Sequence, residues 1–571
     1  KDPVELSISL QELRLIDVTL VDWNQAKGNT LQLGVDDGLL SFYTVDPAQK
    51  TVRCRDILLD GLFVRVAERH GQITVEEYDR REQEKLVLPE YVDLDLYYLA
   101  DSLYKPFRLT SDHIHITNGA FSFDAFRRSA QRRFRADQLD LDHMRVHAID
   151  FEIDSFAMED LDFSGQVDHL TFRDSSGFVA EHISASEVHV NSTRAHLYGL
   201  DLVTPYSRVG DTLIFTYDDY PAFTDFENEV TMDGHFKNCR VALRDIMAFA
   251  IPLERNPFFS QNQEEQVLLN GRIRGTVNRL SSSNLDLRIG SQTSLNSSFN
   301  IRDVTNPDLT FFYFDVNDFR SRVSTLRQLL PGAEQSTQFD KLGKIRFSGN
   351  AAGFYYDFAA SGSLMTEAGV ARVDMQLNTE SGKNEATYRG ALSLENFDLG
   401  RLAGDENLGK ITVTSTVENG RGLTPASAYA DLKASVEDFT FKGYRYENIE
   451  LIGLLNRDFF KGFFRIENDD IDLDFRGSIE QLSTVPRFDM ELRVDQFDLY
   501  ALNLSKKPLS VSGRFDIDLL GKELSKLYGR ADVQDLKLSS DSDTFFLENV
   551  AAMSELSADS VQRFELKAGI G

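Results

Sequence analysis

Apolar and polar, mostly acidic, residues alternate along much of this 571-residue chain. The clearest segment is 515–519, which reads FDIDL, and the same scheme recurs at 139–142, 151–154, 411–414 and 471–475. Successive side chains of a β-strand point to opposite faces, so each segment makes one apolar face and one acidic face. This period predicts antiparallel sheets with one face in water.

The apolar members of these segments must be covered by something. A sheet of about 40 strands, at about 14 residues for each strand and its turn, cannot close into one globular core. Its apolar face must form a trough, pack on a partner or cover a ligand; a closed β-sandwich is the alternative, and periodicity alone slightly favours it. A lipid is the obvious ligand for a trough. The candidate groove residues are Leu139, Leu141, Phe151, Ile153, Ile411, Val413, Ile471, Leu473, Phe515 and Ile517.

The composition excludes several classes of function. The formal net charge of −30 argues against a nucleic-acid partner, because phosphate binding relies on Lys and Arg. Cys54 and Cys239 are the only cysteines, too few for a disulfide scaffold, and the sequence does not decide whether they pair. The sequence contains no nucleophile elbow, phosphate-binding loop or dinucleotide fingerprint. We therefore expect neither an enzyme nor a cofactor.

Other side-chain clusters have ordinary explanations. His113 and His115 share one strand face and are the best metal candidates, but zinc needs further ligands. Residues 468–470 (NDD) are acidic without a complete calcium loop. An arginine run is interpreted as a solvated face paired with nearby acids, with a phosphate or lipid headgroup contact as the alternative. It consists of Arg127, Arg128, Arg132, Arg133 and Arg135.

The chain divides into segments with few helices. Helical spacing of apolar residues predicts helices over 318–330, 238–251 and, more weakly, 95–103. We expect a β-rich segment at 1–252, junction strands with a short helix at 253–338, and a repetitive β segment at 339–571.

A four-residue pattern recurs in the second half of the chain. It reads apolar, polar, Asp/Asn/Gln, then Phe or Leu, and its irregular spacing indicates diverged repeats. The copies lie at 316–319, 394–397, 436–439, 494–497 and 533–536. Small-residue breaks are expected to begin or end strands at 347–349, 388–390 and 475–477.

These repeats resemble the AsmA-like superfamily. The likeness rests on 347–350 (FSGN), followed by an aromatic strand, and on 392–402 (LSLENFDLGRL). It extends to 13–20 (LRLIDVTL), 59–64 (LDGLFV) and 238–246 (NCRVALRDI), and is greatest to the TamB branch of Bacteroidota-type bacteria. The likeness covers nearly all of the chain but is diffuse, and it includes no invariant motif.

The resemblance implies a fold and a function. Members of the superfamily are anchored in the inner membrane and place a long, β-rich, U-shaped (taco-like) apolar groove in the periplasm. It implies phospholipid transport toward the outer membrane, and an outer-membrane barrel insertase of the TamA/BamA type as partner. The alternative is a non-enzymatic scaffold or chaperone for outer-membrane β-barrel proteins. The anchor helix and C-terminal domain of the superfamily are not found in the chain, and we expect that they lie outside this sequence.

Overall fold

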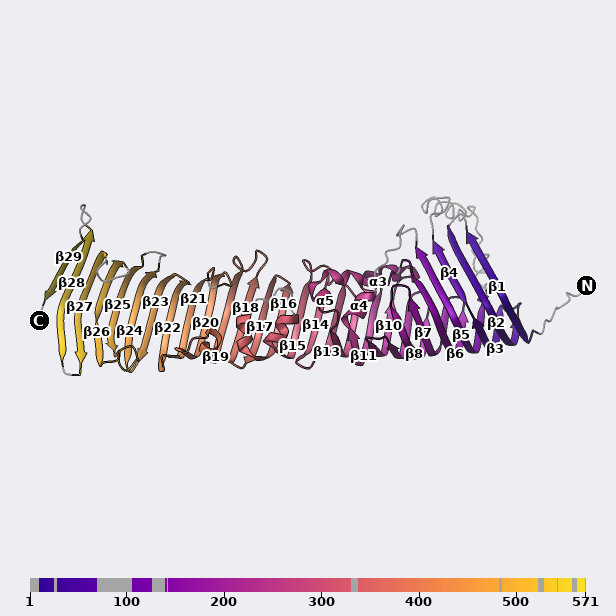
Figure 1. The fold of residues 1–571 in the computed structure, drawn as a ribbon, viewed down its shortest axis with the longest axis horizontal. Helices are drawn as coiled ribbons and strands as arrows, with labels where there is room; N and C mark the ends of the chain where they lie inside the picture. The colour runs from indigo at the N-terminus through magenta and orange to yellow at the C-terminus, as the bar shows by residue number, and fades with distance from the viewer. Residues whose placement is uncertain are drawn as a thin grey trace, which may run out of the picture. The chain divides into compact units, whose positions relative to one another are not determined.

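The chain forms one antiparallel-dominated β-sheet, as the alternation predicts. The computed structural model describes residues 10–24, 28–68, 105–125, 139–140, 142–329, 337–424, 426–481, 485–521, 528–541, 543–556 and 562–569. Within these residues the sheet has 29 strands, and no helix exceeds seven residues (Figure 1). The expected all-β class with a few short helices is confirmed. The strands are longer and fewer than the 14-residue spacing suggests.

The molecule consists of two compact units. Unit 1 comprises Lys1–Ser291 with Asn296–Thr310, and unit 2 comprises Gln292–Leu295 with Phe311–Gly571. The division between them falls within the expected junction segment 253–338.

Unit 1 holds the first strands and most of the helical turns. Its strands are β1 (Glu12–Asn24), β2 (Asn29–Asp46), β3 (Thr51–Asp60), β4 (Phe63–Glu68), β5 (Arg108–Ala125), β6 (Arg145–Glu159), β7 (Asp162–Asp174), β8 (Val179–Val190), β9 (Arg194–Val203), β10 (Arg208–Thr216), β11 (Thr231–Ala242), β12 (Gln266–Thr276) and β13 (Arg279–Ile289). Its helices are η1 (Tyr220–Asp225), α3 (Phe226–Glu229), α4 (Leu243–Phe249), η2 (Ile251–Arg255) and α5 (Pro257–Gln261). The strand β14 (Thr293–Arg302) contains residues of both units.

The pairing in unit 1 has one irregular region. β2 pairs with β1, β3 and β4, and β5 then runs parallel to both β3 and β4. β3 and β4 therefore lie end to end between β2 and β5, like one strand with a break in it. The interruption lies at Gly61, whose positive φ of 65° a residue with a side chain rarely adopts. From β5 to β13 each strand pairs antiparallel with the next.

Unit 2 is a regular antiparallel ladder from β15 to β29. Its strands are β15 (Phe311–Arg322), β16 (Lys344–Phe354), β17 (Asp357–Thr366), β18 (Gly369–Asn378), β19 (Thr387–Asp398), β20 (Leu408–Arg421), β21 (Tyr429–Phe441), β22 (Tyr444–Asn456), β23 (Phe459–Asn468), β24 (Ile471–Glu480), β25 (Arg487–Phe497), β26 (Leu509–Leu520), β27 (Tyr528–Ser540), β28 (Thr544–Leu556) and β29 (Gln562–Gly569). Its helices are α6 (Val323–Leu329), η3 (Thr337–Leu342) and α7 (Leu399–Ala403).

The recurring four-residue pattern is a β-bulge. In β15, Val316 pairs with Gly349 and Phe319 with Phe347, so three steps along β15 oppose two along β16. The register shifts in the same way at the copies in β19, β21, β25 and β27. An apolar residue and an aromatic residue three positions later would normally point to opposite faces. The extra residue of the bulge returns both side chains to the apolar face.

The small-residue segments are not strand ends, as the sequence suggested. Gly349, Gly390 and Gly477 lie inside β16, β19 and β24. Each has a φ between 138° and 149°, and a Cβ there would come within 2.2 Å of a carbonyl oxygen of the neighbouring strand. Such glycines allow a strand to bend and its backbone to approach its neighbour closely.

The helices begin later than predicted. The 318–330 segment continues β15 to Arg322 before α6 begins at Val323. The 238–251 segment continues β11 to Ala242 before α4 begins. In both, ladder hydrogen bonds to a neighbouring strand extend the strand into residues with helical spacing. The weaker 95–103 prediction lies outside the described residues.

The two cysteines are free and buried. Cys54 belongs to β3 and packs with Ile57, Ile114 and Ile153. Cys239 lies in β11, where its sulfur accepts a hydrogen bond from the backbone N–H of Gly210 at 3.2 Å. Both thiols therefore fill space in the apolar packing of unit 1.

Candidate functional site

The apolar face of unit 2 is organised in rows that cross the strands. In-register pairing from β22 to β28 aligns one large apolar residue of each strand. We call this the apolar row; it contains Leu451, Phe464, Phe475, Leu492, Phe515, Val533 and Val550. A second row crosses the same strands beside the apolar row and has smaller side chains. This second row contains Gly453, Gly462, Gly477, Met490, Ile517, Ala531 and Ala552.

Aromatic rings cover the glycines of the second row. Phe460 in β23 and Phe475 in β24 approach to 5.7 Å between ring centroids. These residues lie on either side of the directly paired Gly462 and Gly477. Aromatic side chains that cover strand glycines replace the packing that the missing side chains would supply. The abundance of Phe is thus tied to the glycines that bend these strands.

Much of this apolar face remains open. Four of the predicted groove residues, Ile411, Val413, Phe515 and Ile517, are only half-buried. Leu455, in the row next to the glycines, is 42% exposed. Neighbours within one sheet bury a side chain partly, whereas a facing second layer would bury it fully. The apolar residues at these positions therefore have no second layer on them in the described part of the chain.

One stretch of the face is covered by the connection after β25. Leu502 is 0% exposed and packs with Tyr446, Ile449, Ile466 and Ile471. The Asp498 carboxylate accepts hydrogen bonds from the backbone N–H groups of residues 500 and 501 and fixes the turn. The predicted groove residues Ile471 and Leu473 belong to this covered cluster.

In unit 1 the corresponding face is covered by helices. Residues 243–261 (α4, η2 and α5), which we call the helical cover, contact Phe178 and Ala180 through Ala248. Further along, Met247 and Leu253 pack against Val304. The cover thus contacts the apolar face beside β8 and again beside β14 (Figure 1).

The helical cover is held by polar contacts at its start. The Asp245 carboxylate accepts hydrogen bonds from the hydroxyls of Thr204 and Ser207 at 2.6 and 2.5 Å. The backbone N–H of Leu139 donates to the carbonyl of Ala248 at 3.1 Å. The predicted groove residue Leu139 is therefore buried under α4.

The other unit 1 candidates belong to packed structure as well. Ile153 is buried in a cluster with Ile57 and Ile114, and Phe151 packs against that cluster. Leu141 lies outside the described residues. Among the described groove candidates, those at β20 and β26 are half-buried and outside any covered cluster, and so are the ones open to a ligand.

The opposite face is charged and carries shallow depressions. One of about 530 Å³ spans β23 to β28. Its lining includes acidic and basic groups such as Asp474, Arg493 and Arg514, together with residues of the apolar row such as Phe475 and Phe515. Two others, of about 300 and 710 Å³, lie over β17 to β20. Ion pairs such as Arg493–Asp495 at 2.7 Å balance the charges on this face.

The metal and calcium candidates have partners within the protein. His113 Nδ1 lies 2.8 Å from an Asp154 oxygen, and His115 Nε2 lies 3.4 Å from an Asp150 oxygen. The hydrogen bond to Asp154 is the main cause that raises the pKa of His113 above its ordinary value. Among the described residues, no group of three or more His, Cys, Asp or Glu side chains is arranged to hold a metal ion.

The acidic turn 468–470 connects β23 to β24. Its Asp470 carboxylate accepts a hydrogen bond from the Tyr444 hydroxyl at 3.0 Å. Burial, and then this hydrogen bond, raises the pKa of Tyr444 to about 12. The turn is therefore part of the packing against β22.

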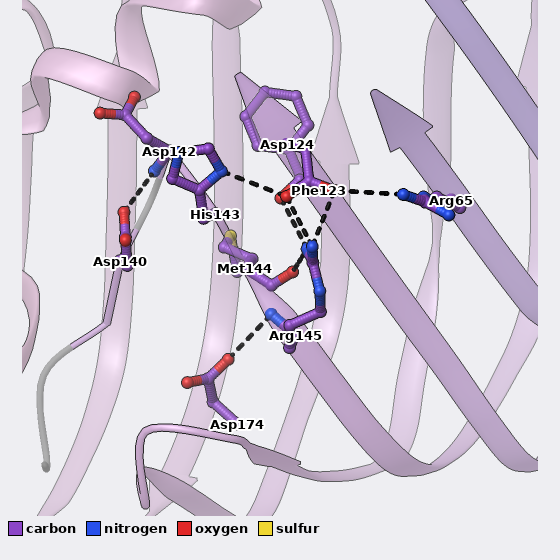
Figure 2. A network of polar contacts seen from close by, with 9 residues as sticks. All are labelled: Arg65, Phe123, Asp124, Asp140, Asp142, His143, Met144, Arg145 and Asp174. Atoms are coloured by element: carbon purple, nitrogen blue, oxygen red, sulfur yellow. Dashed lines mark hydrogen bonds and ion pairs between the residues drawn. The ribbon is translucent and has the colours of Figure 1, made fainter. Parts of the chain in front are cut away.

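A buried polar network, which was not predicted from the sequence, joins β4, β5 and β6 (Figure 2). Asp124 and His143 are each 1% exposed. Arg145 donates two hydrogen bonds to the Asp124 carboxylate, at 2.6 and 2.8 Å. His143 Nδ1 lies 3.1 Å from the same carboxylate, and Arg65 Nη2 lies 3.8 Å from it.

The network also fixes the backbone around it. The guanidinium of Arg145 donates to the carbonyls of Phe123 and Met144 at 3.1 and 2.8 Å. The backbone N–H of Ala125 donates to the carbonyl of Asp142 at 2.7 Å. A buried carboxylate is stable only when paired and hydrogen-bonded, so Asp124 ties the end of β5 to the start of β6. Its position in the otherwise apolar stretch 121–126 (FSFDAF) was the available sequence signal. The arginine run that follows lies outside the described residues.

Comparisons with models of protein families, with curated proteins and with solved structures found no match. No helix in the described ranges has both the length and the apolar character needed to cross a membrane.

Proposed function

We propose that this chain binds phospholipid acyl chains on its open apolar face, as a periplasmic protein of the AsmA-like, TamB type that supports transport between the inner and outer membranes. The half-buried apolar residues of β25–β27 carry this proposal. They form continuous rows instead of a filled core. Water contact with these rows is unfavourable, and hydrocarbon is the chemistry that relieves it.

The free-energy scale suits a transport surface. Each acyl CH₂ removed from water contributes about 0.8 kcal/mol, so a chain of about 16 carbons contributes roughly 13 kcal/mol. A lipid that slides from one row position to the next keeps this contribution. The rows repeat at every strand, which is about 4.8 Å along the sheet.

In this proposal the apolar face is the inside of a U-shaped groove. Two features support such curvature. Glycines inside β16, β19 and β24 permit bends, and bulges recur in β15, β19, β21, β25 and β27. Bulges and glycine kinks are the devices that curve sheets. Headgroups would remain at the rim, in water.

An assembly scaffold for β-barrel proteins, acting with a barrel insertase, is the competing function. It would pair exposed strand edges with incoming strands. In unit 2, each strand from β16 to β28 already has a partner on both sides. The ladder leaves few edges for augmentation, and this favours the lipid proposal.

Native mass spectrometry of the gently purified chain tests the function. We expect peaks displaced by phospholipid masses. Replacing Ile517 by Asp places a charge in the second row and should remove them. Replacing Asp516 by Asn, on the same strand but the opposite face, is the matched control and should leave them unchanged.

Two results would contradict the proposal. One is a protein without bound lipid that also fails to take up phospholipid from vesicles. The other is lipid retention that is equal in the Ile517→Asp and Asp516→Asn variants. Capture of unfolded barrel peptides by lipid-free protein would instead favour the scaffold.

A further inference from the structure

The charged face of unit 2 changes character at β15–β17. Much of this face carries acidic and basic residues, but here three aromatic residues gather on it, Phe311, Tyr313 and Phe354. Phe311 pairs directly with Phe354, and their rings meet edge to face at 5.4 Å. The turn that follows adds Tyr355 and Tyr356, whose rings pack at 4.9 Å. We call these five residues the aromatic platform.

The platform faces solvent. Tyr313, Phe354, Tyr355 and Tyr356 are each between 42% and 48% exposed. The turn that presents the two tyrosines is fixed, because the carbonyl of Tyr356 accepts a hydrogen bond from the backbone N–H of Thr379 at 2.7 Å. A contiguous cluster of exposed aromatic rings on a polar face is typical of a ligand-binding surface.

A polar wall adjoins the platform. Asp357 follows the turn directly and pairs with Asn378, which pairs in turn with Thr387. The next row brings Gln376 opposite Arg389. Together with Glu418, Asn419, Gly420, Arg421 and Tyr388, these residues line the depression of about 300 Å³.

The chemistry of the wall selects the ligand. Its two acids, Asp357 and Glu418, balance its two guanidinium groups, Arg389 and Arg421, so the wall favours no net charge. Its amides and hydroxyl supply both donors and acceptors. The Gln376 side chain is already oriented, since its oxygen accepts from Arg389 at 2.8 Å.

We propose that the aromatic platform and this polar wall form a binding site for an uncharged oligosaccharide. A pyranose ring has an apolar C–H face and a rim of hydroxyls. The aromatic rings would stack against the former, and the amide, carboxylate and guanidinium groups would bond the latter. A lipid bilayer fits less well, because half of the surface is made of hydrogen-bonding groups. This site lies on the face opposite to the acyl-binding rows and does not depend on the proposed function.

Isothermal titration of the full chain with cellohexaose and with the hexamer of N-acetylglucosamine tests the site. At least one should bind in a saturable manner. The exposed tyrosines can be changed without loss of core packing, so Tyr355→Ala and Tyr356→Ala should each weaken binding by about ten-fold. Gln376→Ala should weaken it as well, through the wall.

Tyr500→Ala is the matched control, because Tyr500 is also an exposed tyrosine but lies in the connection after β25. It should bind the saccharide as the unmodified protein does. Three outcomes would overturn the site: neither hexasaccharide binds, binding is unaffected by both tyrosine variants, or Tyr355→Ala abolishes binding to phosphatidylcholine vesicles while no saccharide binds. Lipid retention in native mass spectrometry should be unchanged in all these variants, which separates this test from that of the proposed function.

Discussion

Unit 1 and unit 2 use the same alternating strands but treat their apolar faces differently. In unit 1 the helical cover places Met247, Ala248 and Leu253 on the face, and all three are buried. In unit 2 the segment around Leu502 folds back onto part of the face, whereas apolar residues of β20 and β26 remain half-buried. The difference teaches that strand pattern sets where apolar side chains point, while the connections decide whether they are covered.

The charged faces of the two units differ in their histidine content. All ten histidines of the chain lie before residue 236, and His113, His115 and His189 pair with carboxylates. Arginine pairs with carboxylates in both units, as at Arg208 in unit 1 and Arg493 in unit 2. Arginine keeps its charge at every physiological pH, whereas histidine changes charge near neutrality.

The largest expected effect concerns the buried network of unit 1. Replacing Asp124 by Ala removes the buried carboxylate and leaves the half-buried guanidinium of Arg145 without that partner. We expect unit 1 to lose about 3–5 kcal/mol of unfolding free energy. Hydrogen exchange should show lost protection in β5 and β6 and unchanged protection in β24–β27. Equal loss in both units would contradict the comparison.

A matched pair of leucine truncations measures the covered and open faces directly. Leu253→Ala creates a cavity in the helical cover and should cost about 2–5 kcal/mol. Leu519→Ala removes a half-buried side chain from β26 and should cost about 1 kcal/mol. Urea denaturation provides the measurement. Comparable costs would show that β26 is covered in solution.

The segment after β25 allows the same test within unit 2. Leu502→Ala should destabilise unit 2 by about 2–4 kcal/mol, because the side chain is fully buried. Leu504→Ala, in the same segment but exposed, should change stability by less than about 0.5 kcal/mol. If the covered cluster becomes accessible, Leu502→Ala should also increase lipid retention in native mass spectrometry.

The smallest effect is a pH dependence confined to unit 1. The pKa of His113 is raised, chiefly by its hydrogen bond to Asp154. The stabilisation from this pair is therefore fully present below the ordinary histidine pKa of about 6.5 and is lost as pH rises through the raised value. The destabilisation caused by His113→Gln should be larger at about pH 5.5 than at about pH 8.5. Urea midpoints at both pH values measure it, and a pH-independent difference would contradict the assignment.

Particular residues show how far the sequence could be used. The alternation at 515–519 predicts that Phe515 and Ile517 share a face, and the register confirms it. The four-residue repeats were visible, but their meaning as bulges was not, because a bulge is defined by the partner strand. The predicted helix over 318–330 was wrong at its start for the same reason. Pairing with β16 extends the strand β15 to Arg322, and the helix begins after it.

The candidate site, too, could be predicted only in part from the sequence. The covered state of Leu139 could not be predicted, because the residues that cover it lie more than a hundred positions later, in α4. Leu502 carried no sign in the sequence that it would be the most buried of the large side chains. Long-range contacts of this kind depend on where a connection folds, and local periodicity does not contain that information.

The sequence by itself determined the class of fold and the composition of its two faces, because strand geometry turns every second residue the same way. Only the tertiary structure decided which stretches of the apolar face are covered. That outcome depends on connections such as residues 243–261 and 498–507, whose packing is set by side chains distant in the chain.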